Sequence, residues 1–402
     1  MWTILPWACA AAISVLALKY LPIPYLWVFL LWSMVLFFTA AIDRVRRALW
    51  FNGACLLIGL AVFEYYFWMS RPEALREERV NAGTYAEQIY VPHEKLGWAP
   101  RPGIAVSQSA FYQGDVLYDV NYTIGRNGLR VSSPSAGHER SPDSECIPFF
   151  GCSFVFGQGL DDYQTLPFQV DVKADSRYRT FNFGVMGYGA HQMLSALQYE
   201  LVDDAMRCDR AQVSHVLYQA ISDHVRRAAG RIWWNTRGPR YRLTRDGEVR
   251  LDGRFEDDRR IDKSFARLLS NQLMKSMIYA AVIQGKYVRK YNQETIDLYL
   301  GIVDEARDLV YSRYPCAEFH VLLWDEDDVD NNAIRDGLRQ MGIDVHLMSE
   351  ILPNYQVDEL NDAYRLHPID VHPNALANDL IADYVVREIL PRPVPCDFSR
   401  TS

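Results

Sequence analysis

The sequence carries no strong excess of charge and no sustained basic stripe. Its 402 residues include 42 Lys and Arg against 50 Asp and Glu, which gives a formal net charge of -8. Proteins that bind nucleic acid through its phosphate groups need a basic surface. We therefore expect no nucleic-acid partner.

Repeats, low-complexity segments and metal-binding motifs are also missing from the sequence. The seven cysteines and nine histidines show none of the spacings typical of a metal site. On this basis no metal and no cofactor is expected. Folded domains and membrane segments remain as the architectures to consider.

Long hydrophobic runs are concentrated in the first seventy residues, at 3–18, 25–42 and 48–69. The second and third approach the length of a bilayer-spanning helix, and Trp and Tyr residues supply interfacial anchors. The first is short enough for a signal peptide but lacks a basic start. A buried hairpin of a soluble protein is the alternative, disfavoured because polar residues do not alternate with the apolar ones. We expect residues 1–70 to form a membrane anchor of about three transmembrane helices.

Arginines between the second and third runs predict the orientation of this anchor. Arg44, Arg46 and Arg47 should stay in the cytoplasm under the positive-inside rule. The third span then runs outward, through a charged linker at 71–92. The prediction is a multi-pass inner-membrane protein whose large domain, 93–396, is periplasmic or otherwise extracytoplasmic.

The large domain reads as an α/β fold. After a β-rich extension at 93–146, short apolar strands at 147–150, 180–183, 214–219, 318–323 and 344–347 alternate with helical patterns at 190–207, 295–314, 331–341 and 374–390. This alternation predicts a mostly parallel sheet covered on both faces. An insertion at 226–291 contains a hairpin signal at Asp246-Gly247.

One serine and one acid–base pair stand out in this domain. Ser153 lies in Gly151-Cys152-Ser153-Phe154-Val155-Phe156-Gly157, directly after an apolar strand, and Asp370-Val371-His372 lies near the C-terminus. A serine hydroxyl is a weak nucleophile until a base takes its proton, and a carboxylate holds the imidazole in the useful tautomer. Val155 stands where the G-x-S-x-G elbow of α/β-hydrolases requires glycine, so that elbow is not present.

The segment around Ser153 resembles the first sequence block of the SGNH (GDSL-like) hydrolase superfamily. Residues 182–187 resemble the second block, 220–223 the third and 370–374 the fifth, in the family's order. The resemblance covers 147 to about 390. It implies a three-layer α/β/α, flavodoxin-like domain with a mostly parallel sheet.

The resemblance also implies a catalytic set. Ser153 would be the nucleophile, His372 the general base and Asp370 the carboxylate that orients it. The oxyanion would be bound by the backbone N–H groups of Ser153 and Gly187 and by Ser222, which stands where the family usually has Asn. A serine side chain reaches less far than Asn, and one lost oxyanion donor lowers the rate by about 10²–10³-fold.

Other side chains near these motifs are alternatives. Cys152 replaces the family's aspartate and could itself be a nucleophile, although alternation near a strand end points it away from the direction of Ser153. His367 is a rival base, but no carboxylate stands two residues before it. His191 and His224 lie near predicted strand ends, where a structural role is favoured over a place in the pocket.

Four residues are expected to contact the substrate. Asn182 belongs to the second block, Tyr188 follows it, and Trp233 and Trp234 lie in the insertion among arginines. Aromatic rings there could stack on sugars while arginines pair with acidic groups. The alternative is that the insertion is an ordinary lid packed on the domain.

Three functions follow from these motifs. The stretch from Leu96-Gly97-Trp98 to Gly128-Leu129-Arg130 resembles members associated with exopolysaccharide O-acetylation of the alginate type. The first hypothesis is an esterase acting on an O-acylated, and specifically O-acetylated, carbohydrate. The second is an O-acetyltransferase that depends on a membrane acyl-donor protein. The third is a weakly active or inactive glycan-binding scaffold.

The cysteines outside the apolar runs leave two possibilities open. Cys146, Cys208 and Cys316 each precede a predicted strand, so they could lie at one end of the sheet, and Cys396 follows near the C-terminus. One disulfide there fits an oxidising compartment. Unpaired core cysteines fit the sequence equally well.

Overall fold

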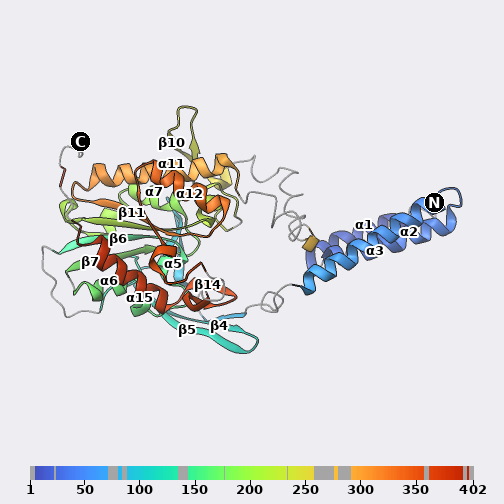
Figure 1. Ribbon diagram of the computed structural model, residues 1–402, viewed down its shortest axis with the longest axis horizontal. Helices are drawn as coiled ribbons and strands as arrows, with labels where there is room; N and C mark the ends of the chain where they lie inside the picture. Colours follow the sequence, from blue (N-terminus) through green and yellow to red (C-terminus); the bar gives the residue numbers. More distant parts are fainter. Residues whose placement is uncertain are drawn as a thin grey trace. The chain divides into compact units, whose positions relative to one another are not determined.

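The computed structural model describes residues 5–21, 24–70, 80–83, 88–134, 144–175, 177–232, 234–257, 276–278, 291–356, 362–392 and 396–397 (Figure 1). Contacts within the chain divide it into two compact units. The first combines Met1–Glu78 with Arg259–Lys290, and the second combines Arg79–Asp258 with Tyr291–Ser402.

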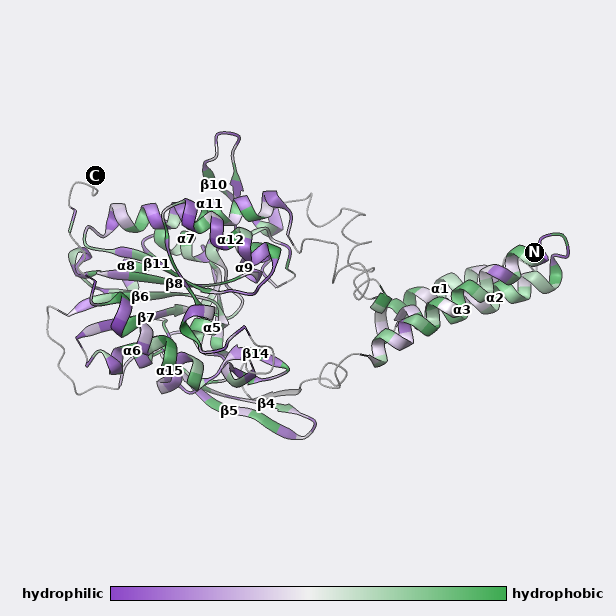
Figure 2. Ribbon diagram, in the orientation of Figure 1, coloured by the Kyte–Doolittle hydropathy of each residue, from purple (hydrophilic) through white to green (hydrophobic). Residues whose placement is uncertain are grey.

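Three apolar helices make up most of the first unit: α1 Leu5–Tyr20, α2 Pro24–Ile42 and α3 Arg47–Met69. Figure 2 shows hydrophobic residues around most of their surface. By length and composition, α2 and α3 are long and apolar enough to cross a membrane. Large side chains on them are exposed, with Met34 at 69% and Val62 at 61%, whereas a soluble core helix would bury them. At 16 residues, α1 is shorter than the roughly 20 needed for a span, and an anchor of three transmembrane helices stays a prediction.

One acidic residue is buried within α3. Glu64 has no exposed surface, accepts a hydrogen bond from the N–H of Met277 (2.7 Å) and binds the hydroxyl of Ser276. A carboxylate in an apolar helix must be paired. Residues 276–278 supply that partner and pack against this helix.

The second unit is built on a five-stranded parallel sheet, as the sequence predicts. Its strands are β6 Glu145–Gly151, β7 Tyr178–Gly184, β8 His215–Ile221, β11 Glu318–Trp324 and β12 Asp344–Leu347. Their order in space is β12-β11-β8-β6-β7. Numbered along the chain this is 2-1-3-4-5, an order of doubly wound sheets in which the direction of winding reverses between the first and third strands, here β6 and β8.

Helices cover both faces of this sheet (Figure 1). One face carries α7 Ala190–Gln198, α11 Gln293–Arg313 and α12 Val329–Gln340, and the other carries α6 Leu166–Lys173, α15 Ala375–Tyr384 and the π-helical turn η7 Val385–Ile389. Because side chains alternate along a strand, Phe150 packs into the first layer and Phe149 into the second. The sheet is therefore covered on both sides, and its central strands β6, β8 and β11 are buried along nearly their whole length, whereas the edge strand β7 alternates buried and half-buried residues.

Two predicted helices differ from the structure. The single helix expected at 190–207 is interrupted, because Glu200 adopts a left-handed conformation (φ 57°), and α8 Leu201–Met206 begins after it. The helix expected at 374–390 is α-helical only to Tyr384 and continues as η7. The expected hairpin at Asp246-Gly247 is confirmed, with strands β9 Pro239–Leu243 and β10 Val249–Arg254 and Gly247 at φ 86°.

The β-rich extension forms two small antiparallel groups. They consist of β1 Val80–Gly83, β4 Ala105–Tyr112 and β5 Asp115–Thr123, and of β2 Tyr90–His93 and β3 Gly97–Pro100. The predicted linker at 71–92 thus contains β1, which pairs with β4, and most of β2, which pairs with β3. Other short elements are α5 Ser153–Phe156, α9 Asp223–Ala228, α13 Met348–Ile351, β13 Arg365–His367 and β14 Asp370–Pro373. Turns of 3-10 helix lie at Asp162–Gln164, Arg210–Gln212, Phe255–Asp257 and Asp362–Tyr364.

Two disulfides join distant parts of the second unit. Cys146 at the start of β6 bonds to Cys208, which is one of the pairings open to the sequence. Cys316 bonds to Cys396 instead of joining the other two, and this second bridge ties the C-terminal segment to the start of β11. Both bridges fit an oxidising compartment.

Candidate active site

Ser153 lies where the doubly wound sheet changes its winding direction. It is the first residue of α5, directly after β6, and Ser222 directly follows the neighbouring strand β8. Open α/β sheets bind ligands in the crevice outside the carboxyl ends of two such strands. The fold therefore brings two of the predicted site residues to the place where the chemistry of these sheets occurs.

The structure brings Ser153, His372 and Asp370 into one hydrogen-bonded chain. The Nε2 atom of His372 lies 2.9 Å from Oγ of Ser153, and its Nδ1 atom lies 2.5 Å from Oδ1 of Asp370. Asp370 and His372 are two residues apart on β14, so both side chains project from the same face of the strand. Asn374 ends this segment by capping α15 through the N–H of Ala377 (3.0 Å).

Burial sets the electrostatic character of this chain. Asp370 is 2% exposed and Ser153 is 6% exposed, and the ring of Phe154 packs 5.4 Å from that of His372. A buried carboxylate beside Nδ1 favours the tautomer that carries its proton on that nitrogen. The Nε2 lone pair then faces the serine hydroxyl, which is the arrangement of a general base and its nucleophile.

Glycine permits the close packing around the serine turn. A Cβ atom on Gly184 would lie 2.3 Å from the backbone nitrogen of Phe156, so β7 can approach α5 only because this residue is glycine. The N–H of Val185 donates to the carbonyl of Gly151 (3.3 Å). These contacts hold the loop that carries Gly187 next to the loop that carries Ser153.

The predicted oxyanion donors have different surroundings. Gly187 has φ 84°, and a Cβ there would lie 2.9 Å from Nε1 of Trp234, so only glycine fits without strain. As the first residue of α5, Ser153 has an N–H with no acceptor inside its own helix. Ser222 is 8% exposed, and its side chain makes no capping hydrogen bond with α9.

Arg130 holds the far side of the serine turn, a role that no sequence motif predicts. Its guanidinium is buried, donates to the carbonyls of Phe156 (2.6 Å), Gly157 (2.7 Å) and Leu160 (2.6 Å), and pairs with Asp162 (2.9 Å). Three carbonyls that end α5 and its following loop converge on one cation. The only sequence signal for this role is that Arg130 closes the N-terminal stretch of the family resemblance.

Of the predicted substrate contacts, two are enclosed. Asn182 is 1% exposed, its amide donates to the carbonyl of Val155 (2.9 Å) and its oxygen accepts from the N–H of Gly184 (3.0 Å), so it fastens β7 to α5. Tyr188 is 6% exposed, and its hydroxyl donates to the carbonyl of Trp98. Asn182 is closed to solvent, whereas Tyr188 shows a small part of its surface in the wall of an apolar cavity.

Of the two tryptophans predicted to contact the substrate, Trp234 is accessible to solvent and Trp233 lies outside the described residues. The Trp234 side chain donates to the carbonyl of Gly187 (3.4 Å) and is 36% exposed. Together with Trp98 and Arg237 it lines a depression of about 340 Å³. The aromatic surface that the sequence predicts is therefore next to the candidate oxyanion glycine.

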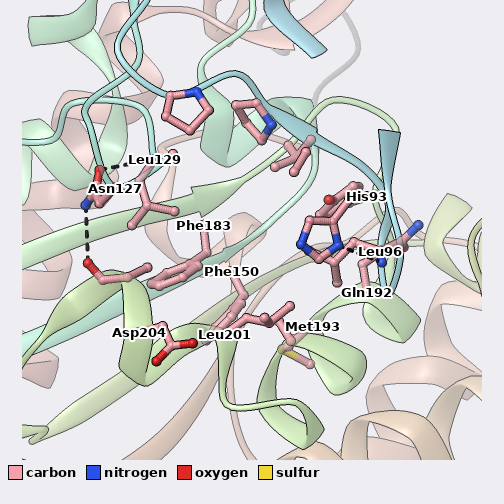
Figure 3. Close-up of a pocket in the computed structure, with 18 of the residues that line it drawn as sticks. His93, Leu96, Asn127, Leu129, Phe150, Phe183, Gln192, Met193, Leu201 and Asp204 are labelled. Atoms are coloured by element: carbon pink, nitrogen blue, oxygen red, sulfur yellow. Dashed lines mark hydrogen bonds between the residues drawn. The ribbon is translucent and has the colours of Figure 1, made fainter. Parts of the chain in front are cut away.

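An apolar cavity of about 410 Å³ lies along the same edge of the domain (Figure 3). Phe150 and Gly151 of β6, Met193 of α7 and Leu96 of the extension are among its lining residues. Ser153 and His372 are not among the residues that line it. The sequence gives no signal for this cavity because its wall is assembled from four separate segments.

The alternative residues have structural partners. Cys152 is fully buried beside the guanidinium of Arg227. The imidazole of His372 is hydrogen-bonded to the neighbouring Ser153. Burial lowers the pKa of His191 to about 3 and that of His224 well below its usual value, so both are neutral at physiological pH. They bond to Asn235 (2.6 Å) and Tyr218 (2.6 Å), respectively.

His367 also lies outside this arrangement. It is on β13, accepts a hydrogen bond from the N–H of Ile369 (3.3 Å) and packs against Tyr112. Its contacts are with the β-rich extension. His372 is the histidine that the structure places on Ser153.

Comparisons with known proteins give only a distant likeness. No family model matches the chain, and no curated protein matches it. Among solved structures, an acetyl xylan esterase (Est2A) from the rumen bacterium Butyrivibrio proteoclasticus is 10% identical, with a TM-score of 0.35, over 63% of this chain and 64% of that one. Another solved structure is 10% identical with a TM-score of 0.33, over 63% of this chain and all of that one. At these TM-scores the likeness establishes neither a shared family nor a shared activity.

Proposed function

We propose that this protein is a serine ester hydrolase of the SGNH type, acting on an O-acylated, specifically O-acetylated, carbohydrate. The observation that carries the proposal is the hydrogen-bonded chain Ser153–His372–Asp370 at the switch point of the sheet. The 2-1-3-4-5 strand order is that of flavodoxin-like domains and supports the assignment of fold.

The proposed reaction begins when Oγ of Ser153 attacks the ester carbonyl and its proton moves to Nε2 of His372. The oxyanion of the tetrahedral intermediate is bound by the N–H groups of Ser153 and Gly187 and by the hydroxyl of Ser222. The intermediate collapses to an acyl-enzyme as His372 protonates the leaving sugar oxygen. Water activated by His372 then releases the acid and restores Ser153.

The surroundings of the triad support a carbohydrate substrate outside the cytoplasm. Trp98, Trp234 and Arg237 line one depression beside Gly187, and exposed aromatic rings are suited to stacking on sugars. The two disulfides favour an oxidising compartment. An inner-membrane protein with its large domain on the periplasmic side accommodates all of these features.

Replacement of Trp234 by alanine is expected to affect a sugar ester and a small ester differently. Because the ring would stack on the glycan, KM for an acetylated oligosaccharide should rise about 3–10-fold. The kcat/KM for p-nitrophenyl acetate should stay within about twofold of the wild type. Trp234→Phe, which keeps an aromatic face, is the matched control, and equal effects on both substrates would argue against a stacking role.

Replacement of Ser222 tests the unusual oxyanion position. If its hydroxyl is a donor, Ser222→Ala should lower kcat for p-nitrophenyl acetate about 10–100-fold with little change in KM. Ser222→Asn restores an amide of longer reach and should retain or raise kcat. An unchanged kcat in Ser222→Ala would remove this side chain from the oxyanion site.

One assay distinguishes hydrolysis from acyl transfer. The full-length protein in detergent is incubated with p-nitrophenyl acetate, with and without an oligosaccharide acceptor, beside Ser153→Ala. An esterase releases p-nitrophenol and acetate, and a transferase yields acetylated sugar from the same acyl-enzyme. No turnover by the wild type would leave the glycan-binding scaffold as the better account.

A further inference from the structure

Three histidines lie side by side near the amino ends of neighbouring strands. His215 on β8, His320 on β11 and His346 on β12 are 1%, 0% and 3% exposed. In the parallel register His320 pairs with Asp344, and His346 follows two residues later on the same face. Ser153 follows the carboxyl end of β6, so this cluster is at the opposite edge of the sheet.

Three donor atoms of this cluster form a nearly equilateral triangle. The Nδ1 atom of His320 lies 3.3 Å from Nε2 of His346, and Oδ2 of Asp344 lies 3.3 Å from the first and 3.4 Å from the second. Zinc with bonds of about 2.0–2.1 Å in tetrahedral geometry holds its ligand atoms about 3.3–3.4 Å apart. An octahedral ion with bonds of that length would hold them about 2.9 Å apart. The triangle matches one face of a tetrahedron.

The second nitrogen of each imidazole has a partner that suits metal binding. Nδ1 of His346 lies 2.9 Å from the hydroxyl of Tyr384, and Nε2 of His320 lies 3.2 Å from Nδ1 of His215. If these outer nitrogens carry the protons, the inner two are left with lone pairs that point at each other and at a carboxylate. Such outer hydrogen bonds orient the histidine ligands of known metal sites.

The carboxylate of Asp344 is hydrogen-bonded to an arginine and lies on the side from which an ion can reach the cluster. Oδ2 of Asp344 also accepts a hydrogen bond from Nη1 of Arg392 (2.5 Å), and a carboxylate oxygen can serve two partners at once. The Asp344 side chain is 44% exposed, so an ion can reach the buried imidazoles past it. A second group of possible metal ligands consists of His215, Glu318 and His320. Its donor atoms include a longer separation, 3.7 Å between Nε2 of His320 and Oε2 of Glu318, so it matches a tetrahedral face less well.

We propose that His320, His346 and Asp344 bind one zinc ion in tetrahedral geometry, with water in the fourth position. The ion joins β11 to β12, and through Tyr384 and Arg392 it fastens the end of α15 and the segment that follows. The cluster is at the end of the sheet opposite Ser153, so the ion takes no part in the proposed ester hydrolysis. The proposal is independent of the proposed esterase.

Metal content and affinity test the site directly. The full-length protein is stripped with a chelator, loaded with Zn²⁺, passed through gel filtration and analysed for zinc by mass spectrometry. We expect one zinc per chain, and Co²⁺ in its place should give the intense visible absorption of a four-coordinate ion. Asp344→Asn, which keeps the shape of an exposed side chain, and His346→Gln should each weaken zinc binding by about 100-fold or more.

His367→Gln is the matched control, since that histidine lies outside the cluster and should leave zinc binding unchanged. Circular dichroism and the thermal unfolding transition of each variant show whether it has folded, and this control does not depend on the proposed ester hydrolysis. Absence of bound zinc in the loaded wild type would overturn the proposal. So would zinc binding by Asp344→Asn and His346→Gln equal to that of the wild type, or the weak absorption of six-coordinate Co²⁺. The cluster would then be a set of hydrogen-bonded histidines.

Discussion

Replacement of Ser153 by alanine is expected to lower kcat/KM for p-nitrophenyl acetate by about 10⁴–10⁶-fold. Oγ is the only side-chain atom of this residue that can form the acyl bond, and Nε2 of His372 lies 2.9 Å from it, close enough to take its proton. His372→Ala should cause a loss of similar size. Because the two residues act as one unit, the double variant should be little worse than either single variant. Steady-state hydrolysis by the full-length protein in detergent measures all three.

Cys152 provides the matched control for this result. Cys152 is the neighbouring thiol and is fully buried. Cys152→Ala should therefore change the rate by less than about tenfold, through packing alone. If Ser153→Ala were active and Cys152→Ala inactive, the nucleophile would be the thiol of Cys152.

Replacement of Arg130 by methionine is expected to destabilise the large unit by about 3–5 kcal/mol. Three carbonyls and the carboxylate of Asp162 lose their buried cationic partner, and methionine supplies no donor. Because two of these carbonyls, of Phe156 and Gly157, end the helix that begins with Ser153, kcat should fall as well. Thermal unfolding followed by tryptophan fluorescence measures the first effect, and ester hydrolysis below the transition measures the second.

Arg126 offers the control for Arg130. It is a nearby arginine with an exposed side chain, so Arg126→Met should change the free energy of unfolding by no more than about 0.5 kcal/mol. Equal stability of the Arg130→Met and Arg126→Met variants would mean that the serine turn does not depend on the buried guanidinium.

Much of the fold could be predicted from local patterns. The central strands of the sheet are buried on both faces and appear as short apolar runs, and all five strands occur within about three residues of their expected bounds. The expected position of Ser153 after β6 follows from the same pattern. The hairpin at Gly247 could be predicted because only a few residue types favour its backbone conformation.

The remaining features depend on contacts between segments that are distant in the sequence. Arg130 acts through carbonyl groups, which every residue has, so nothing in the sequence shows its partners. Asp344 and His346 lie 24 or more residues from His320, and only the parallel register of β11 and β12 brings their donor atoms together. The break at Glu200 arises from a backbone conformation that this residue type seldom adopts. These are consequences of tertiary structure.

Covalent labelling of the nucleophile tests the proposed acyl-enzyme most directly. The full-length protein is treated with a fluorophosphonate, which reacts with activated serines, and the adduct is located by mass spectrometry of its peptides. We expect one adduct per chain on Ser153, absent from Ser153→Ala and formed much more slowly in His372→Ala. An unlabelled Ser153 in the folded wild type, or labelling that is equally fast without His372, would contradict a triad of Ser153, His372 and Asp370.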